Sequence, residues 1–206
     1  MLNIRISYIK IAAAFALALT VAGGAIARNK TNTPAKATVS NIKIRNFGQM
    51  DDRFYRGAQP SESDFRDLAA LGIKTVIDLQ AAGQSYEKRD VEALGMQYIN
   101  IPMEESTYPT DGQVAMFLKV VDDPKTGKFF VHCAGGKHRT GVMGAVYRFT
   151  HDHWNLDQVY SEMKQYNFST SWGHGMYKDF VQDYWKHVQA TPSASAVRTA
   201  AASTNK

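Results

Sequence analysis

The only cysteine of the chain, Cys133, ends a short apolar run and is followed by a glycine-rich turn and then by Arg139. A thiolate nucleophile needs positive potential nearby, and backbone N–H groups at the start of a helix can supply it, as can a guanidinium. The C-x5-R spacing allows the loop to curl once, so that its amides point inward and Arg139 closes the ring. Such a nest binds a tetrahedral dianion, and arginine can hold two of its oxygens at once.

These residue types predict a phosphoryl-transfer reaction at Cys133. The thiolate attacks phosphorus and forms a phosphocysteine, which water then hydrolyses. Arg139 and the loop amides are expected to hold the equatorial oxygens more strongly in the transition state than in the ground state. Gly135 and Gly136 permit the positive φ and the close backbone approach that the curl requires. This chemistry needs no metal ion or other cofactor.

Four neighbours of the cysteine are expected to assist it. His132 is expected to orient the loop from beneath through hydrogen bonds. The hydroxyl of Thr140, at the start of the next helix, is expected either to cap that helix or to donate to the sulfur. Lys137 adds a second cation and His138 can become a third. The alternative for Lys137 is that it only faces solvent. A concentration of positive charge favours polyanionic substrates.

The segment resembles the signature loop of the cysteine-dependent protein tyrosine and dual-specificity phosphatase superfamily. It is most similar to the atypical dual-specificity phosphatases of plants and fungi and their bacterial relatives. The likeness rests on His132-Cys133 and Arg139-Thr140-Gly141, and extends upstream to residues 54–61 and 71–79. The resemblance implies a phosphatase fold over about residues 53–185. It assigns the loop residues to substrate binding: Ala134, Gly135, Gly136, Lys137, His138 and Arg139.

A phosphatase also needs an acid that protonates the leaving oxygen. Asp111 stands where similar atypical members carry an aspartate, just before the helix that leads to the loop. The sequence Thr110-Asp111-Gly112-Gln113 also fits a capping box, which would make Asp111 an ordinary first-turn acid. Glu105 follows a predicted strand end, where dual-specificity and phosphoinositide phosphatases often place their acid. We favour Asp111 and keep Glu105 as the alternative.

The composition indicates one α/β domain preceded by a targeting segment. Residues 1–27 carry Arg5 and Lys10, an apolar run over 11–21 and an A-x-A site, which predicts a secretory signal peptide and a periplasmic or secreted protein. An uncleaved anchor is less favoured because the run is short for a membrane span. Removing the signal leaves 22 basic and 19 acidic residues, or +3, without the basic stripe typical of nucleic-acid binding. No spacing typical of a metal site is present.

Hydrophobic periodicity predicts a mainly parallel central sheet flanked by helices, with a helical cluster at the C-terminal end. Residues 28–41 are expected to form a polar linker, 42–190 the phosphatase domain and 191–206 a disordered tail. The predicted strands are 42–47, 53–56, 74–79, 97–101 and 128–132. The predicted helices are 61–71, with Ser61 as its N-cap, then 86–94, 112–121, 140–151, 156–166 and 177–187.

The sequence therefore predicts a phosphoric monoester hydrolase. Its expected substrates are phosphotyrosine, phosphoserine or phosphothreonine esters, with inositol polyphosphates or phosphoinositides as the alternative. Arsenate reduction is disfavoured because the chain has no second cysteine to resolve an intermediate. A non-catalytic phosphate-binding module is a further alternative, and Cys133, Arg139 and Thr140 argue against it.

Overall fold

The computed structural model describes residues 42–171 and 173–190. The predicted signal peptide over 1–27, the linker over 28–41 and the tail over 191–206 lie outside the described residues. Among the helices that are described, none is both long enough and apolar enough to cross a bilayer.

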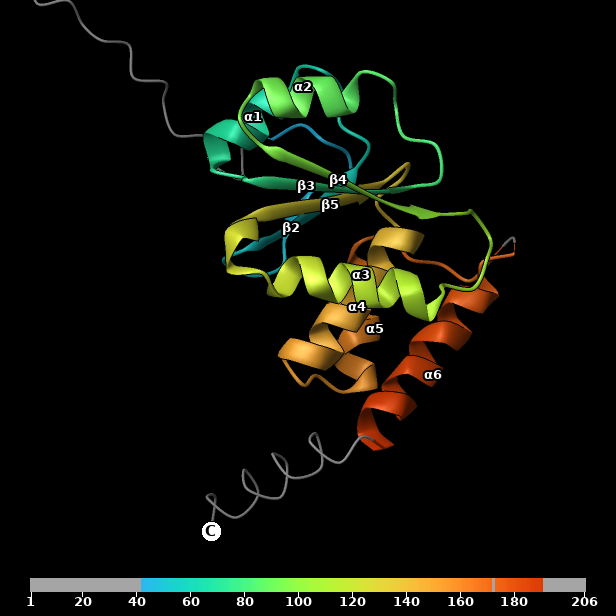
Figure 1. Ribbon diagram of the computed structural model, residues 1–206. Helices are drawn as coiled ribbons and strands as arrows, with labels where there is room; N and C mark the ends of the chain where they lie inside the picture. Colours follow the sequence, from blue (N-terminus) through green and yellow to red (C-terminus); the bar gives the residue numbers. More distant parts are fainter. Residues whose placement is uncertain (1–41, 172, 191–206) are drawn as a thin grey trace, which may run out of the picture. The chain divides into compact units, whose positions relative to one another are not determined.

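A five-stranded sheet in the order β1-β2-β5-β3-β4 forms the centre of the fold (Figure 1). All neighbouring strands pair in parallel except β1 and β2, which are antiparallel. The strands are β1 (Gly48–Gln49), β2 (Phe54–Ala58), β3 (Thr75–Gln80), β4 (Gln97–Met103) and β5 (Phe129–Cys133). The predicted α/β class with a mainly parallel sheet is confirmed.

Helices cover both faces of the sheet, as buried parallel strands require. Figure 1 shows α1 and α2 on one face and α3 to α6 on the other. The helices are α1 (Asp64–Leu71), α2 (Glu87–Ala93), α3 (Asp111–Asp122), α4 (His138–His151), α5 (Leu156–Gln165) and α6 (Gly175–Ala190), with a short 3-10 turn, η2 (Pro124–Thr126), before β5. The predicted cluster of helices at the C-terminal end is therefore present.

Local sequence signals explain several helix ends. Thr110 and Gln113 form the predicted capping box at the start of α3, each side chain bonding the other residue's backbone N–H. Gly72 ends α1 in the left-handed conformation, with φ of 92°. The prediction that Ser61 is the N-cap of α1 is wrong. Ser63 holds that position, and Ser61 instead donates its N–H and hydroxyl to Asp64.

The predicted strand over 42–47 is wrong. This stretch is irregular and contains a turn at Arg45 and Asn46, and Asn46 has a φ of 57°. The Asn46 side chain donates to the backbone oxygens of Gly136 and Tyr166, which are 90 and 120 residues away along the chain. A tertiary contact therefore overrides the strand propensity of the apolar residues around it.

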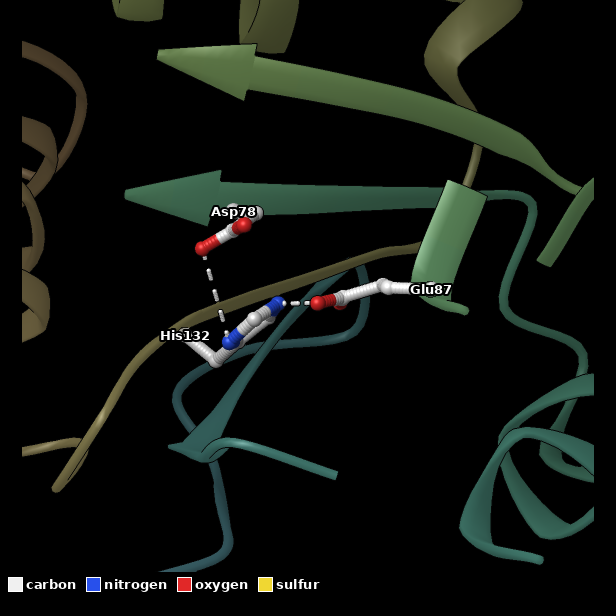
Figure 2. A group of neighbouring side chains, drawn as sticks. All are labelled: Asp78, Glu87 and His132. Atoms are coloured by element: carbon white, nitrogen blue, oxygen red, sulfur yellow. Dashed lines mark ion pairs between the residues drawn. The ribbon is translucent and has the colours of Figure 1, made fainter. Parts of the chain in front are cut away.

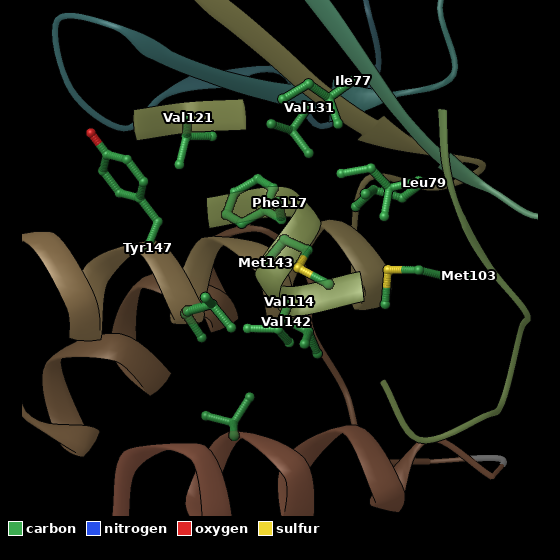
Figure 3. Packing of buried hydrophobic residues seen from close by; sticks show 14 of the residues in the cluster. Ile77, Leu79, Met103, Val114, Phe117, Val121, Val131, Val142, Met143 and Tyr147 are labelled. Atoms are coloured by element: carbon green, nitrogen blue, oxygen red, sulfur yellow. The ribbon is translucent and has the colours of Figure 1, made fainter. Parts of the chain in front are cut away.

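The larger of two hydrophobic clusters lies between the sheet and helices α3 to α6 (Figure 3). Ile77 and Val131 from the strands meet Phe117 of α3 and Met143 of α4, all fully buried. Burial of such side chains stabilises the fold by roughly 1.5–3 kcal/mol each. A smaller cluster packs α1 and α2 against the other face. The sheet is thus fixed on both sides, and its strand ends hold the site rigidly.

Candidate active site

Cys133 is the last residue of β5 and pairs in register with Ala58, the last residue of β2. The loop that follows reaches α4 within four residues. Gly136 has a φ of 64°, and a Cβ there would lie 2.3 Å from the carbonyl carbon of Gly57. Glycine is therefore required at 136. Gly135 has no positive φ, and a Cβ there would make only an ordinary contact with the Lys137 side chain, at 3.7 Å. The predicted need for glycine at both positions therefore holds for Gly136 alone.

Arg139 is buried in the first turn of α4. Its Nη1 donates to the Met103 carbonyl at 3.0 Å, and its Nη2 lies 3.9 Å from Glu105 Oε1. The bond to Met103 ties the arginine to the end of β4. This bond fixes the direction of the guanidinium beside the loop.

His132 lies beneath the loop between two buried carboxylates, Asp78 and Glu87 (Figure 2). Its Nε2 is 2.7 Å from Glu87 Oε1, and its Nδ1 is 3.9 Å from Asp78 Oδ1. Gln59 also donates to Glu87, and Tyr98 donates to Asp78. The three side chains have the residue types of a metal site, yet the two carboxylates face different ring nitrogens. The two carboxylates flank the imidazole at ion-pair distance, but neither ring nitrogen makes an aligned hydrogen bond within the described residues. The hydrogen bonds by which His132 was expected to orient the loop are therefore not seen.

A hollow of about 220 Å³ opens over the thiol. Arg45 and Lys137 line it together with Arg139, so three cations face one carboxylate, that of Glu105. Arg45 was missed by sequence reasoning because it lies 88 residues before Cys133, and nothing in the local pattern marks it.

Three flat rings form one wall of this hollow. The His138 ring stacks on that of His174 with centroids 3.7 Å apart, and Tyr177 lies nearly parallel at 5.9 Å from His138. His138 also bonds the Ser169 backbone oxygen at 3.1 Å. Burial, reinforced by the neighbouring His174, lowers the pKa of His138, which favours its neutral form. The predicted contribution of His138 as a cation therefore requires acidic conditions.

Tyr177 connects α6 to the segment that carries the candidate acids. The Ser106 N–H donates to the Tyr177 hydroxyl at 3.2 Å, and Ser106 itself has a φ of 58°. Burial raises the pKa of Tyr177, so its phenol stays protonated at neutral pH. This contact fixes the backbone next to Glu105, and it was not foreseen because Tyr177 is far away in the sequence.

The two candidate acids lie in different hollows. Glu105 lines the hollow over Cys133, and its side chain is 71% exposed. Asp111 is the first residue of α3 and lines a separate hollow of about 460 Å³ with Tyr108, Phe180 and Asp183. The structure thus brings Glu105, and not Asp111, into the hollow of the thiol.

Thr140 is fully buried as the third residue of α4. Lys137 occupies the N-cap position, so Thr140 does not cap the helix. Its hydroxyl has no hydrogen-bond partner among the described residues, the Cys133 sulfur included. Neither of the two predicted contacts is therefore formed in this state of the site.

A buried thiol at the end of a parallel strand, followed by a loop and a braced arginine, defines a cysteine-dependent phosphatase. The comparisons with known proteins give the same class. The profile of the family described as "DSP-PTPase phosphatase fused to NAD+ Kinase" matches residues 31–181, and the chain belongs to this family.

Three relatives illustrate the range of the family. The "Probable tyrosine-protein phosphatase DG1060" of Dictyostelium discoideum is 29% identical over 132 residues, covering 61% of this chain and 78% of the relative. "Inositol diphosphatase DSP3" of Arabidopsis thaliana is 29% identical over 132 residues, covering 62% and 64%. "Dual specificity protein phosphatase TpbA" of Pseudomonas aeruginosa is 26% identical over 142 residues, covering 67% and 62%. A TpbA crystal structure has the same fold, with a TM-score of 0.60 and 21% identity over 77% of this chain and 99% of that one.

Proposed function

We propose that this phosphatase hydrolyses phosphotyrosine-type esters through a phosphocysteine at Cys133. The observation that carries the proposal is the hollow in which Cys133, Arg139 and Glu105 meet beside the flat wall of His138 and Tyr177. An aromatic leaving group can lie against such a wall, because parallel and offset ring contacts are favourable.

The reaction proceeds in two steps. Cys133 forms an S–P bond while the ester P–O bond breaks, and Glu105 gives its proton to the departing oxygen. Water then attacks phosphorus, Glu105 takes up a proton from that water, and the S–P bond breaks to release phosphate. Arg139 and the loop amides hold the equatorial oxygens throughout.

Glu105 is proposed as the acid in preference to Asp111, which our sequence argument favoured. Its support is the position of its carboxylate in the hollow of the thiol, 3.9 Å from the arginine that would hold phosphate. Asp111 instead follows a complete capping box, where a carboxylate stabilises the helix N-terminus. The proposed role of Thr140 is to donate to the sulfur as thiolate charge returns, because its buried hydroxyl has no other partner among the described residues.

Inositol polyphosphates are a second candidate substrate class. Arg45 and Lys137 supply two cations beyond the one that clamps the reacting phosphate, and a substrate with several phosphates would use them. The relative named inositol diphosphatase DSP3 is consistent with this candidate.

A comparison of kcat/KM on phosphotyrosine peptides and on inositol polyphosphates distinguishes the two classes. The double variant Arg45→Met with Lys137→Met serves as the probe. If the protein is a phosphotyrosine enzyme, the double variant should lose little kcat/KM, and to a similar extent on both substrate classes. A loss confined to inositol polyphosphates, together with faster wild-type turnover of those substrates, would favour the second class.

We also propose that the protein is exported to the periplasm or secreted. Support comes from Arg5 and Lys10, the apolar run over 11–21 and the A-x-A site at 25–27, all outside the described residues. Cell fractionation with mass analysis tests this proposal: the expected product starts at Arg28 and is found outside the cytoplasm. Full-length protein in the cytoplasmic fraction would contradict it.

A further inference from the structure

Arg56 is a fully buried cation in the middle of β2, and the active-site chemistry described above does not use it. Its Nη2 donates to the Gly136 carbonyl oxygen at 2.9 Å, and its guanidinium carbon lies 4.1 Å from the centre of the Tyr166 ring. The space for it is left by two glycines of α4. A Cβ at Gly141 would lie 3.7 Å from Nη2, and one at Gly144 would lie 3.4 Å from Nη1.

No carboxylate forms an ion pair with Arg56 within the described part of the chain. The other buried arginine of this region, Arg148, is paired with both Glu162 and Asp152. Glu162 is the carboxylate that influences Arg56 most, and Arg148 already neutralises it. A buried charge without a partner is costly, so the charge of Arg56 needs another explanation.

The chemistry of the site supplies one further anion beside this strand, the Cys133 thiolate. Arg56 lies two residues before Ala58, the register partner of Cys133, and the two groups interact electrostatically. Burial lowers the pKa of Arg56 to about 10, so the guanidinium is still charged at neutral pH. Tyr166 contributes a π face, which stabilises a cation without adding a negative charge.

The hydrogen bond of Arg56 also bears on the loop geometry. The Gly136 oxygen accepts from Arg56 Nη2 and from Asn46 Nδ2, at 2.9 and 2.8 Å. In a trans peptide the carbonyl and the next N–H point in opposite directions. The two donors therefore hold the Lys137 N–H on the opposite side of the peptide from themselves.

We propose that Arg56 is a positioning residue of the loop between Cys133 and α4. Together with Asn46 it fixes the Gly136–Lys137 peptide, and its buried charge is balanced by the Cys133 thiolate or by bound phosphate. The inference rests on the proposed function, because it assigns the anion to that site, but it does not depend on the identity of the substrate. It predicts that loss of Arg56 weakens both the thiolate and phosphate binding.

Three variants and one control test this inference. Arg56→Met removes charge and donor, Arg56→Lys keeps the charge, and Asn46→Gly removes the other donor while accommodating the positive φ. Arg53→Met is the matched control, because Arg53 directly precedes the same strand and donates to the Gly127 and Val121 carbonyls away from the loop. Each protein is alkylated with iodoacetamide as a function of pH, inhibited with inorganic phosphate and melted thermally.

For Arg56→Met we expect the midpoint of the alkylation profile to rise by about one pH unit and phosphate inhibition to weaken about tenfold. Its melting temperature should stay unchanged or rise, since an apolar side chain replaces a buried ion and the cost of desolvating that ion is removed. Arg56→Lys should restore most of the midpoint, but only part of the phosphate inhibition. Asn46→Gly should weaken phosphate inhibition by roughly three- to tenfold at an unchanged midpoint. Arg53→Met should alter melting alone.

Alkylation needs no substrate, so its result is separate from the test of the phosphatase reaction. The inference is overturned if Arg56→Met behaves like Arg53→Met, with a lower melting temperature and an unchanged midpoint. If Arg56→Met does not fold, Arg56→Lys and Asn46→Gly decide. Unchanged phosphate inhibition in both of these would equally overturn it.

Discussion

Replacing Glu105 by glutamine removes the proton that the proposed mechanism gives to the leaving oxygen, while the shape of the side chain is kept. The rate should fall strongly for esters with a poor leaving group, such as a plain alkyl or phenyl phosphate. Activated esters such as nitrophenyl phosphate should react almost normally, because their leaving group departs without a proton.

The size of the effect follows from the position of Glu105. General acid catalysis contributes about 10²–10⁴ in rate, so kcat/KM for the poor leaving group should fall at least about 100-fold. The glutamate also sits 3.9 Å from Arg139, but at 71% exposure this pair is screened by solvent. Its loss changes phosphate binding by about 1 kcal/mol at most, or roughly fivefold. The two effects therefore differ enough to be separated.

Steady-state kinetics on both esters, across pH, provide the assay. The alkaline limb of the poor-leaving-group profile should disappear in Glu105→Gln. Asp111→Asn is the matched control: it should cost about 0.3–1 kcal/mol of stability as a first-turn acid and leave the ratio of the two rates unchanged. The reasoning is refuted if Asp111→Asn shows the selective loss and Glu105→Gln does not.

Three further outcomes are expected. Gly136→Ala should abolish phosphate inhibition and lower the free energy of unfolding by at least about 1–3 kcal/mol in a denaturant titration. The reason is that its Cβ would lie 2.3 Å from Gly57 and its φ is positive. Gly135→Ala should be tolerated. Glu87→Gln should destabilise the fold by roughly 1–3 kcal/mol in the same assay, since it removes the buried carboxylate that faces His132 and accepts from Gln59. Glu92→Gln, in the exposed pair with Lys88, should cost less than about 1 kcal/mol. The pKa of His138 is lowered in the folded state, so the unfolded state binds the proton at a higher pH. The stability that this shift provides should therefore be fully present above pH 6.5 and fall as the pH drops below it. His138→Gln should flatten this pH dependence in thermal melts. An unchanged slope for His138→Gln would contradict the assigned cause.

The sequence predicts the parts of this protein that are encoded locally. The apolar run before Cys133, the glycine at 136 and Arg139 carry their geometry within a dozen residues. The capping box of Thr110 and Gln113 is equally local. The structure contains this capping box and the strand that ends at Cys133. Hydrophobic periodicity was sufficient to identify the parallel sheet and most of the helices.

The remaining features depend on contacts between distant residues. Asn46 leaves the predicted strand because Gly136 and Tyr166 accept its amide hydrogens. Arg56 is buried against a helix that begins more than eighty residues later. The capping box and the position of Asp111 were both visible in the sequence, but only the folded chain separates the hollow that contains Asp111 from the one that contains Glu105.

The central claim is that Cys133 carries the phosphoryl group during turnover. Acid quenching of wild-type protein during steady-state hydrolysis, followed by mass spectrometry of its peptides, tests this claim directly. We expect one phosphoryl group on the peptide that contains Cys133, a larger trapped fraction in Glu105→Gln with an activated ester, and no turnover in Cys133→Ser. Sustained hydrolysis by Cys133→Ser, or a phosphoryl group on a different residue, would contradict the account.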